Sequence, residues 1–344
     1  MIRIAVDAMG GDAAPSAIVD GALLAAQSAD APHIALCGPE PDVRACLDRS
    51  AAAVPAAVRD AALSRISIHH ASDVVGMHES PSKAVRQKPN NSISVGLELV
   101  RSGAARAIVT AGHTGAAVAG ATLALDLLPG IRRPGIAVTI QAARGPVTVI
   151  DVGANINCKP LHLLHYGVMA SHYHRLVLGV ENPRVGLLNI GEEERKGTDL
   201  VRDTLALFRK SPLNFIGNIE GQDVFNGKCD VVVCEGFVGN VLLKVSEGLA
   251  EWVIRYLSKE SGLPDRSPDQ RQTLEGVRDK FATLIDYSEH GGALLLGING
   301  NCIICHGRSG PKAIANAIRV ATRFVHLEVN NGIVAGLESL AAPA

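Results

Sequence analysis

Four glycine-rich turns with polar side chains follow apolar segments of this chain, and such turns are typical of anion-binding sites. They lie at residues 7–12 (DAMGGD), 111–115 (AGHTG), 235–240 (EGFVGN) and 307–310 (GRSG), and a helical pattern follows each one. Glycine lets the backbone approach a ligand closely, and the start of a helix offers unpaired N–H groups to an anion. The candidate anion-binding residues in these turns are Asp7, Gly10, Gly11, Gly112, His113, Thr114, Gly115, Gly236, Gly239 and Ser309.

Each turn alone is weak evidence, because glycine closes many turns for packing reasons. Four such turns in one chain favour a shared anion site. The nucleotide-binding alternatives lack their motifs, since no G-x-G-x-x-G follows the first apolar run and no G-x-x-x-x-G-K-[ST] occurs. The anion is therefore more consistent with a phosphate-like group than with a dinucleotide.

Two further polar segments add candidate side chains. Residues 151–155 (DVGAN) contribute Asn155, and residues 188–197 (LNIGEEERKG) place Lys196 just before a glycine and a helical pattern. A solvated charge run is the usual explanation of the second segment. The alternative is that Lys196 reaches an anion held at the turns.

Short apolar runs alternate with helical patterns, which predicts a mainly parallel sheet with helices on both faces, a three-layer α/β/α fold. We expect a single catalytic unit over residues 1–335, or two intimately joined subdomains, and a flexible tail at 336–344. Ligand sites of parallel sheets lie at the carboxyl ends of the strands, so we expect the turns to meet at one edge. The strand-like runs are 2–6, 34–37, 107–110, 147–150, 185–189, 231–234 and 302–306, and helical patterns lie at 15–28, 116–128, 161–178, 199–210, 241–257 and 311–325.

A charged segment at residues 258–280, interrupted by Pro264 and Pro268, separates two stretches with apolar residues at helical spacing. This pattern predicts a helical hairpin over 245–285 that projects from the sheet. The hairpin could be an ordinary surface feature, a dimer arm or a membrane contact. Its charged tip argues against deep insertion into lipid.

Charge and composition exclude several classes of protein. The chain has 33 basic and 34 acidic residues, so no overall field attracts nucleic acid. Met1 leads directly into a strand-like run, and no apolar run is long enough to span a bilayer. We therefore expect a cytoplasmic protein whose seven cysteines are reduced thiols.

Taken together, these segments resemble the phosphate acyltransferases of bacterial phospholipid synthesis, the PlsX family. The resemblance runs from Ile4 to about Ala321 in order and nearly without gaps. Its motifs are 7–12 (DAMGGD), 111–116 (AGHTGA), 151–155 (DVGAN), 188–197 (LNIGEEERKG), 215–221 (FIGNIEG), 235–240 (EGFVGN), 291–297 (GGALLLG) and 306–309 (HGRS).

The resemblance implies a reaction in which inorganic phosphate attacks the thioester of a long-chain acyl–acyl carrier protein, giving acyl phosphate and free carrier protein. It also implies a homodimer and a fold akin to isocitrate dehydrogenases and phosphotransacetylases. Weak contact with a membrane or with a downstream acyltransferase is a further expectation. An acidic carrier protein could meet the basic residues Arg132 and Arg133 or the group at 83–88, although a solvated face explains these charges equally well.

This reaction makes modest demands on the protein. Phosphate is a competent nucleophile and a thiolate is a good leaving group, so we expect no covalent enzyme nucleophile, no metal and no cofactor. The protein must hold a dianion against a carbonyl and stabilise the resulting oxyanion. We expect Lys196 to be the phosphate cation and Asn240 a donor to phosphate or carbonyl, with His306 and Ser309 as further contributors.

Three positions depart from the pattern that the resemblance implies. His113 replaces the usual Asn, Glu235 replaces the usual Asp, and His290 to Leu294 stand where the family usually has Tyr-Gly-Gly-Ala-Pro. His113 is titratable, so phosphate binding could depend on pH. Glu235 keeps the charge but moves it by one methylene group.

Other groups that could carry chemistry have simpler explanations. The run at 302–306 matches the C-x-x-C-H haem-attachment pattern, but buried thiols beside a turn are favoured. His162, His165, His172 and His174 lie in one helical pattern and are interpreted as packing or surface histidines rather than metal ligands. Cys158 could accept an acyl group, but phosphate makes this unnecessary and no base is paired with it.

Two rival functions remain open at the level of the sequence. One is a metal- and NAD-dependent decarboxylating dehydrogenase of related fold, for which carboxylates such as Asp7 and Asp12 could be metal ligands. The other is an inactive scaffold that binds carrier protein. Phosphate-dependent release of the carrier's thiol would distinguish acyl transfer from both.

Overall fold

Eleven strands form one sheet in the described part of the chain, residues 2–285 and 291–341 of the computed structural model. The order across the sheet is β3-β2-β1-β4-β11-β10-β5-β6-β9-β7-β8. The strands are β1 Arg3–Asp7, β2 His33–Gly38, β3 Ile66–His70, β4 Ala107–Thr110, β5 Gly135–Ala142, β6 Gly145–Ile150, β7 Val185–Leu188, β8 Phe215–Ile219, β9 Val231–Val233, β10 Ala293–Leu296 and β11 Cys302–Ile304.

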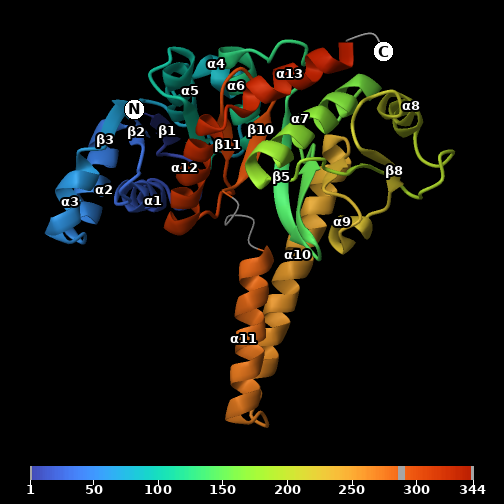
Figure 1. Cartoon of the computed structure of the whole chain (residues 1–344). Helices are drawn as coiled ribbons and strands as arrows, with labels where there is room; N and C mark the ends of the chain where they lie inside the picture. The colour runs from blue at the N-terminus through green and yellow to red at the C-terminus, as the bar shows by residue number, and fades with distance from the viewer. Residues whose placement is uncertain (1, 286–290, 342–344) are drawn as a thin grey trace.

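Helices cover both faces of this sheet, as Figure 1 shows. They are α1 Ser16–Ala26, α2 Glu40–Ala52, α3 Ala56–Leu63, α4 Pro81–Gln87, α5 Ser92–Arg101, α6 Thr114–Leu125, α7 Pro160–Leu178, α8 Asp199–Phe208, α9 Asp223–Asn226, α10 Gly236–Ser261, α11 Pro268–Ile285, α12 Pro311–His326 and α13 Val329–Ala341.

Alternate residues of the central strands belong to two separate cores. In β1, Ile4 and Val6 pack into one cluster of buried apolar residues, and Ala5 packs into the other. In β4, Val109 belongs to the first cluster and Ile108 to the second. Because successive side chains of a strand point to opposite faces, the two clusters lie on opposite sides of the sheet. The predicted three-layer α/β/α architecture is confirmed.

The sheet reverses direction near its middle. β3, β2, β1, β4 and β11 are mutually parallel, whereas β10 is antiparallel to both β11 and β5, and β5 is antiparallel to β6. β9, β7 and β8 then continue parallel to β6. Three successive antiparallel pairings, β11 with β10, β10 with β5 and β5 with β6, leave the second group of parallel strands running against the first.

This reversal corrects one expectation. The turns after β1, β4 and β11 lie at one edge of the sheet, and the turns after β6, β7 and β9 lie at the opposite edge. The expectation that the turns share one edge was therefore wrong, because it assumed that all the strands they follow are parallel.

The last helix corrects a second expectation. The tail expected at 336–344 is helical through Ala341, because α13 buries Ile333 completely and Leu337 at 9% exposure against the core. Residues 342–344 lie outside the described part of the chain, as does His290. The strand expected at 302–306 ends at Ile304, so His306 lies in the turn that follows it.

Helices α10 and α11 pack against each other and project far from the sheet (Figure 1). Their connection includes Pro264, and Arg266 forms an ion pair with Glu260 there. α10 begins beside the sheet and carries a row of exposed apolar side chains along its length, among them Val245, Leu249 and Trp252. No helix of the described chain combines the length and apolar character needed to cross a bilayer.

Candidate active site

The turn after β1 is joined to the turn after β4 by a buried carboxylate. Asp7 accepts hydrogen bonds from the Thr110 hydroxyl at 2.6 Å and from the N–H of Met9 at 3.1 Å. The Thr110 oxygen in turn accepts from the N–H of Gly112 at 3.0 Å. Burial raises the pKa of Asp7 above its usual value, and the hydrogen bonds oppose this shift. The buried Asp7 carboxylate therefore holds the turn after β1 and the turn after β4 together.

Glycine is required where these turns touch. A Cβ atom on Gly10 would lie 2.5 Å from the amide nitrogen of Gly112. Gly11 has a positive φ of 99°, and a Cβ atom there would lie 2.9 Å from the carbonyl oxygen of Gly307. The N–H of Asp12 donates to the same oxygen at 2.8 Å. Three turns, after β1, β4 and β11, thus meet as one group, which we call the first cluster.

His113 begins α6 within the first cluster. Its Nδ1 accepts a weak hydrogen bond from the N–H of Ala116 at 3.4 Å, so the imidazole acts as the N-cap of the helix. Thr114 and Gly115 form the first turn of α6. An Asn side chain at this position would make the same type of cap, which explains in physical terms how His can replace it.

His306 and Ser309 complete the first cluster. The N–H of Arg308 donates to Nδ1 of His306 at 3.1 Å, and the N–H of Ser309 donates to its carbonyl oxygen at 2.9 Å. The pKa of His306 is lowered by burial and then by the charge of Lys244, which lies on α10. Because a lowered pKa favours the neutral imidazole, His306 is uncharged near neutral pH.

The second cluster lies at the opposite edge, after β6 and β9. The Asp151 carboxylate is fully buried and accepts from the N–H groups of Gly153, Ala154 and Asn155 at 3.1, 2.9 and 2.7 Å. Burial raises the pKa of Asp151, and these bonds oppose the rise. The amides of this loop already have a partner, so they are not a free anion cradle.

Asn155 is also turned inward. Its side-chain amide donates to the carbonyl oxygen of Pro134 at 2.6 Å and to the Tyr166 hydroxyl at 2.9 Å. These contacts fix the loop rather than leave a donor for substrate. The structure therefore assigns Asn155 a supporting position within the second cluster.

The start of α10 packs on this loop through two glycines. A Cβ atom on Gly239 would lie 1.9 Å from the carbonyl oxygen of Asp151, and one on Gly236 would lie 2.6 Å from that of Asn155. Glu235 caps the helix, because its carboxylate accepts from the N–H groups of Phe237 and Val238 at 2.7 and 2.8 Å. The longer side chain of Glu thus performs the capping role that Asp would have.

Asn240 is exposed one turn into α10. Gly153 lies beside it, since a Cβ atom on Gly153 would be 3.7 Å from Oδ1 of Asn240. No residue in the described part of the chain forms a hydrogen bond with the Asn240 side chain. Its amide is therefore available to a ligand. Of the sequence-predicted side chains, Asn240 is the one in this cluster that the structure leaves open to substrate.

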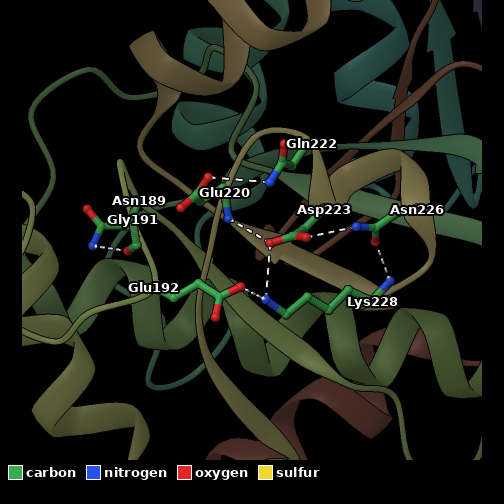
Figure 2. A network of polar contacts seen from close by, with 8 residues as sticks. All are labelled: Asn189, Gly191, Glu192, Glu220, Gln222, Asp223, Asn226 and Lys228. Atoms are coloured by element: carbon green, nitrogen blue, oxygen red, sulfur yellow. Dashed lines mark hydrogen bonds and ion pairs between the residues drawn. The ribbon is translucent and has the colours of Figure 1, made fainter.

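Lys196 lies on the loop after β7, and Figure 2 shows Asn189, Gly191 and Glu192 at the start of this loop. Its ammonium group pairs with Glu193 at 2.8 Å, and this hydrogen bond raises the pKa of Lys196. Glu192 pairs with Lys228, which also contacts Asp223 at 3.2 Å (Figure 2). The loop is thus tied to the α9 region, and the exposed side chain of Lys196 is held by its own loop.

Helix α10 connects the two clusters. It begins at the second cluster, and Lys244 is near enough to His306 in the first cluster to affect its pKa. Lys244 follows Asn240 by one helical turn, about 6 Å along the axis. Lys244 pairs with Glu247 at 2.8 Å. Lys244 is not among the residues predicted from the sequence, although its i, i+4 spacing from Asn240 places both on one helix face.

Cysteine and metal chemistry have little support in this geometry. All seven cysteines are free thiols, and Cys302 and Cys305 are buried, as predicted. Burial raises the pKa of Cys158, which disfavours the nucleophilic thiolate. His165 and His174 are buried packing residues in α7. Within residues 2–285 and 291–341, no group of three or more His, Cys, Asp or Glu side chains is placed to hold a metal ion.

Comparison with known proteins gives the family context. The sequence model of a family described as "Fatty acid synthesis protein" matches residues 2–332. The phosphate acyltransferase of Geobacter sp. (strain M21) is 48% identical over 329 residues, which are 96% of this chain and 91% of that protein. The phosphate acyltransferase of Geobacter sulfurreducens is 45% identical over 338 residues, 98% of this chain and 95% of that protein.

Solved structures show the same fold at low sequence identity. A phosphotransacetylase from Streptococcus pyogenes superposes with a TM-score of 0.62 at 15% identity and covers 94% of each chain. A branched-chain phosphotransacylase from Enterococcus faecalis V583 gives 0.56 at 16% identity over 95% of this chain and 100% of that one. The expected phosphotransacetylase-like fold is confirmed.

Proposed function

Since the chain belongs to the fatty acid synthesis protein family, whose curated relatives are phosphate acyltransferases, we propose that it moves the acyl group of an acyl–acyl carrier protein to inorganic phosphate. Acyl transfer to phosphate for lipid synthesis is the property of the family. We further propose that the acyl donor is a carrier protein and that the acyl phosphate is used in phosphatidic acid synthesis. The observation that carries the proposal is the family match over nearly the whole chain, including every turn of the two clusters.

The chemistry needs no group beyond the two substrates. An oxygen of hydrogen phosphate forms a bond to the acyl carbon, and the carbon–sulfur bond then breaks. The electron pair leaves on the sulfur of the carrier protein, which is released as a thiol or thiolate. The protein contributes position and electrostatic stabilisation of the charge that develops on the carbonyl oxygen.

We assign roles to the side chains that remain open to a ligand. Asn240 donates to the phosphate or the thioester carbonyl at the second cluster. The neutral His306, the Ser309 region and the turn at 112–115 belong to the first cluster, which α10 reaches through Lys244. Lys196 supplies a cation after leaving Glu193. This exchange is inexpensive, because an exposed ion pair contributes about 0–1 kcal/mol. Lys244 is a second cation within the same region.

We also propose that the protein works as a homodimer in the cytoplasm. The support is the exposed apolar face of α10, where Val245 is 63% exposed and Leu249 and Trp252 are each 60% exposed. A contiguous apolar face of this kind marks an interaction surface. The mixed charges at the hairpin tip, such as Asp265 and Arg266, favour at most weak contact with a membrane.

The proposal is tested by following free thiol from palmitoyl–carrier protein with and without phosphate. We expect thiol release only with phosphate, independent of NAD and magnesium. Lys196→Ala and Asn240→Ala should each lower kcat/KM by about 100-fold, the size of effect seen when one transition-state donor is removed. Lys210→Ala, an exposed lysine at the end of α8, is the matched control and should remain near wild type.

Three results would contradict parts of this assignment. Near-normal turnover in either variant would remove that residue from the catalytic set. NAD reduction dependent on a divalent metal would favour a dehydrogenase. Binding of carrier protein without phosphate-dependent release of its thiol would indicate a scaffold.

A further inference from the structure

A cavity of about 600 Å³ opens between the first turn of α10, the start of α8 and the loop before α7. This volume lies within the range of about 300–1,000 Å³ typical of small-molecule sites. Its apolar lining comes from all three segments, from α7 and from β7 with the loop after it: Ile156, Leu163, Leu188, Ile190, Leu200, Val201 and Val238.

The apolar surface continues to the mouth of this cavity. Ile190 is 79% exposed and Ile156 is 66% exposed. The cavity between α7 and the α13 region differs, because it is lined by His172, Arg175 and Glu181 among others. Of these two cavities, the one beside α10 has the chemistry of a site for a hydrocarbon chain.

The walls of the cavity belong to the segments that carry the proposed chemistry. Glu235 and Val238 come from the first turn of α10, and Gly197 comes from the loop of Lys196. Cys158 lines the same cavity, and its thiol donates to the carbonyl oxygen of Asn155 at 3.5 Å. A ligand in the cavity would therefore end beside the second cluster.

Basic residues lie on the α7 side of the cavity, and the acidic Glu235 is also among its lining residues. Lys159 lies in the rim, and both Lys159 and Arg133 are close enough to lower the pKa of His162 after the effect of burial. Arg132 acts in the same direction on the neighbouring His165. Arg132, Arg133 and Lys159 are all exposed. Basic residues beside an apolar cavity fit a hydrocarbon chain delivered by an acidic carrier.

We propose that this cavity holds the acyl chain of the thioester substrate, with the thioester at its rim between Glu235 and the loop of Lys196. The proposal rests on the proposed function and deepens it, because it assigns the acyl chain to one cavity of this chain. The apolar row of α10 has a different shape, a convex helix face suited to a second copy of the chain. The concave cavity suits a single flexible chain.

Chain length should then control the rate. Each methylene group buried in the cavity contributes about 0.8 kcal/mol, which corresponds to about a fourfold rise in kcat/KM. Val201→Trp fills the cavity from α8. We expect it to lower kcat/KM for palmitoyl–carrier protein by at least about tenfold, while octanoyl–carrier protein stays within about threefold of wild type. Leu24→Trp, at an exposed apolar residue of α1, should leave the whole profile unchanged.

The result separates this proposal from the one on which it rests. Absence of phosphate-dependent thiol release with every chain length would refute the proposed function. Release with the same chain-length profile in Val201→Trp and wild type would refute the acyl cavity alone.

Cys158 provides a second test that needs no turnover. It is partly exposed, whereas Cys37, Cys46, Cys229, Cys234, Cys302 and Cys305 are buried. In the absence of phosphate, palmitoyl–carrier protein should protect Cys158 of the wild-type protein from iodoacetamide, measured by mass spectrometry. Carrier protein without an acyl chain should give much less protection. Equal protection by both would show that the carrier's surface, not the chain, covers the thiol. Cys158 could also be protected from iodoacetamide before substrate is added and become reactive when the protein is diluted, which would show that a second copy of the chain fills the cavity. Either this result or equal protection by both forms of carrier protein overturns the proposal.

Discussion

Single side chains explain how this sequence tolerates His113 and Glu235, two departures from the pattern that the resemblance implies. His113 and Glu235 each accept hydrogen bonds from the first N–H groups of a helix. The role depends on an acceptor atom within reach and not on a particular residue type. The turn geometry is therefore preserved at both positions, and the changes alter the chemistry presented to substrate more than the fold.

Buried histidines predict how stability depends on pH. Burial lowers the pKa of His165 and of His174 to about 4. Their unfolded values are near 6.5, so between these values the unfolded chain binds more protons and stability falls as pH falls. Each histidine should contribute a loss of up to about 3 kcal/mol between pH 6.5 and 4. The buried Asp7 and Asp151 have the opposite sign, because their raised pKa favours proton binding by the folded chain.

A variant isolates the histidine contribution. Urea unfolding of His165→Leu between pH 7.5 and 5 should show a shallower dependence on pH than wild type. Met169→Leu, a volume-conserving change in the same helix, controls for general effects on the core. An unchanged slope in His165→Leu would show that His165 does not remain neutral in the folded state.

For single residues, the sequence indicated which side chains could bind a ligand but not in which direction those side chains point. It suggested Asn240 and Lys196 as candidates, but it could not show that Asn155 turns inward or that Lys196 pairs with Glu193. Those contacts depend on residues such as Tyr166, and a local sequence pattern does not show which distant residues become neighbours in the fold. Lys244 was missed because a lysine in a long helix has no distinguishing local signal until the turn of His306 is placed beside it.

Among the elements, α10 makes the sharpest prediction, because Gly236 and Gly239 at its start are tightly packed, whereas Gly276 of α11 is in open space. Gly239→Ala should destabilise the protein by about 1–3 kcal/mol and displace the Asn240 turn, since the new Cβ atom meets the Asp151 carbonyl oxygen. Gly276→Ala in α11 has no atom within 4 Å of its Cβ position and should stabilise by about 0.5–1 kcal/mol. Denaturant unfolding measures both. Similar losses in the two variants would contradict the packing of α10 on the second cluster.

Elements were easier to predict than their directions. Apolar runs located β1, β4 and β9, and helical spacing located α7 and α12, because these signals are local. Strand direction in the sheet has no such signal. It is set by the long-range pairing of β10 with β5 and β11, and these pairs place the two clusters at opposite edges.

For the whole molecule, the projecting pair α10–α11 predicts the oligomeric state. Trp252 stacks on Tyr256 with ring centroids 5.6 Å apart, in the middle of the exposed apolar row. Trp252→Glu should convert a dimer into a monomer by light scattering, because a charge on an apolar interface must be desolvated. Leu24→Glu removes an exposed apolar residue from α1 instead and should leave the mass unchanged. A dimeric Trp252→Glu protein would place the interface elsewhere.

The position of β11 also constrains how the chain assembles during synthesis. The half-sheet of β1 to β4 is joined to the other half through β11, which pairs with β10, and both of these strands are made after residue 292. β5, β6, β9, β7 and β8 lie between residues 135 and 233 and can pair among themselves first. A nascent chain that has not yet released residues 293–304 from the ribosome thus carries two separate half-sheets, each with an open edge. Those edges are the points at which the growing protein is most exposed to aggregation and to chaperones.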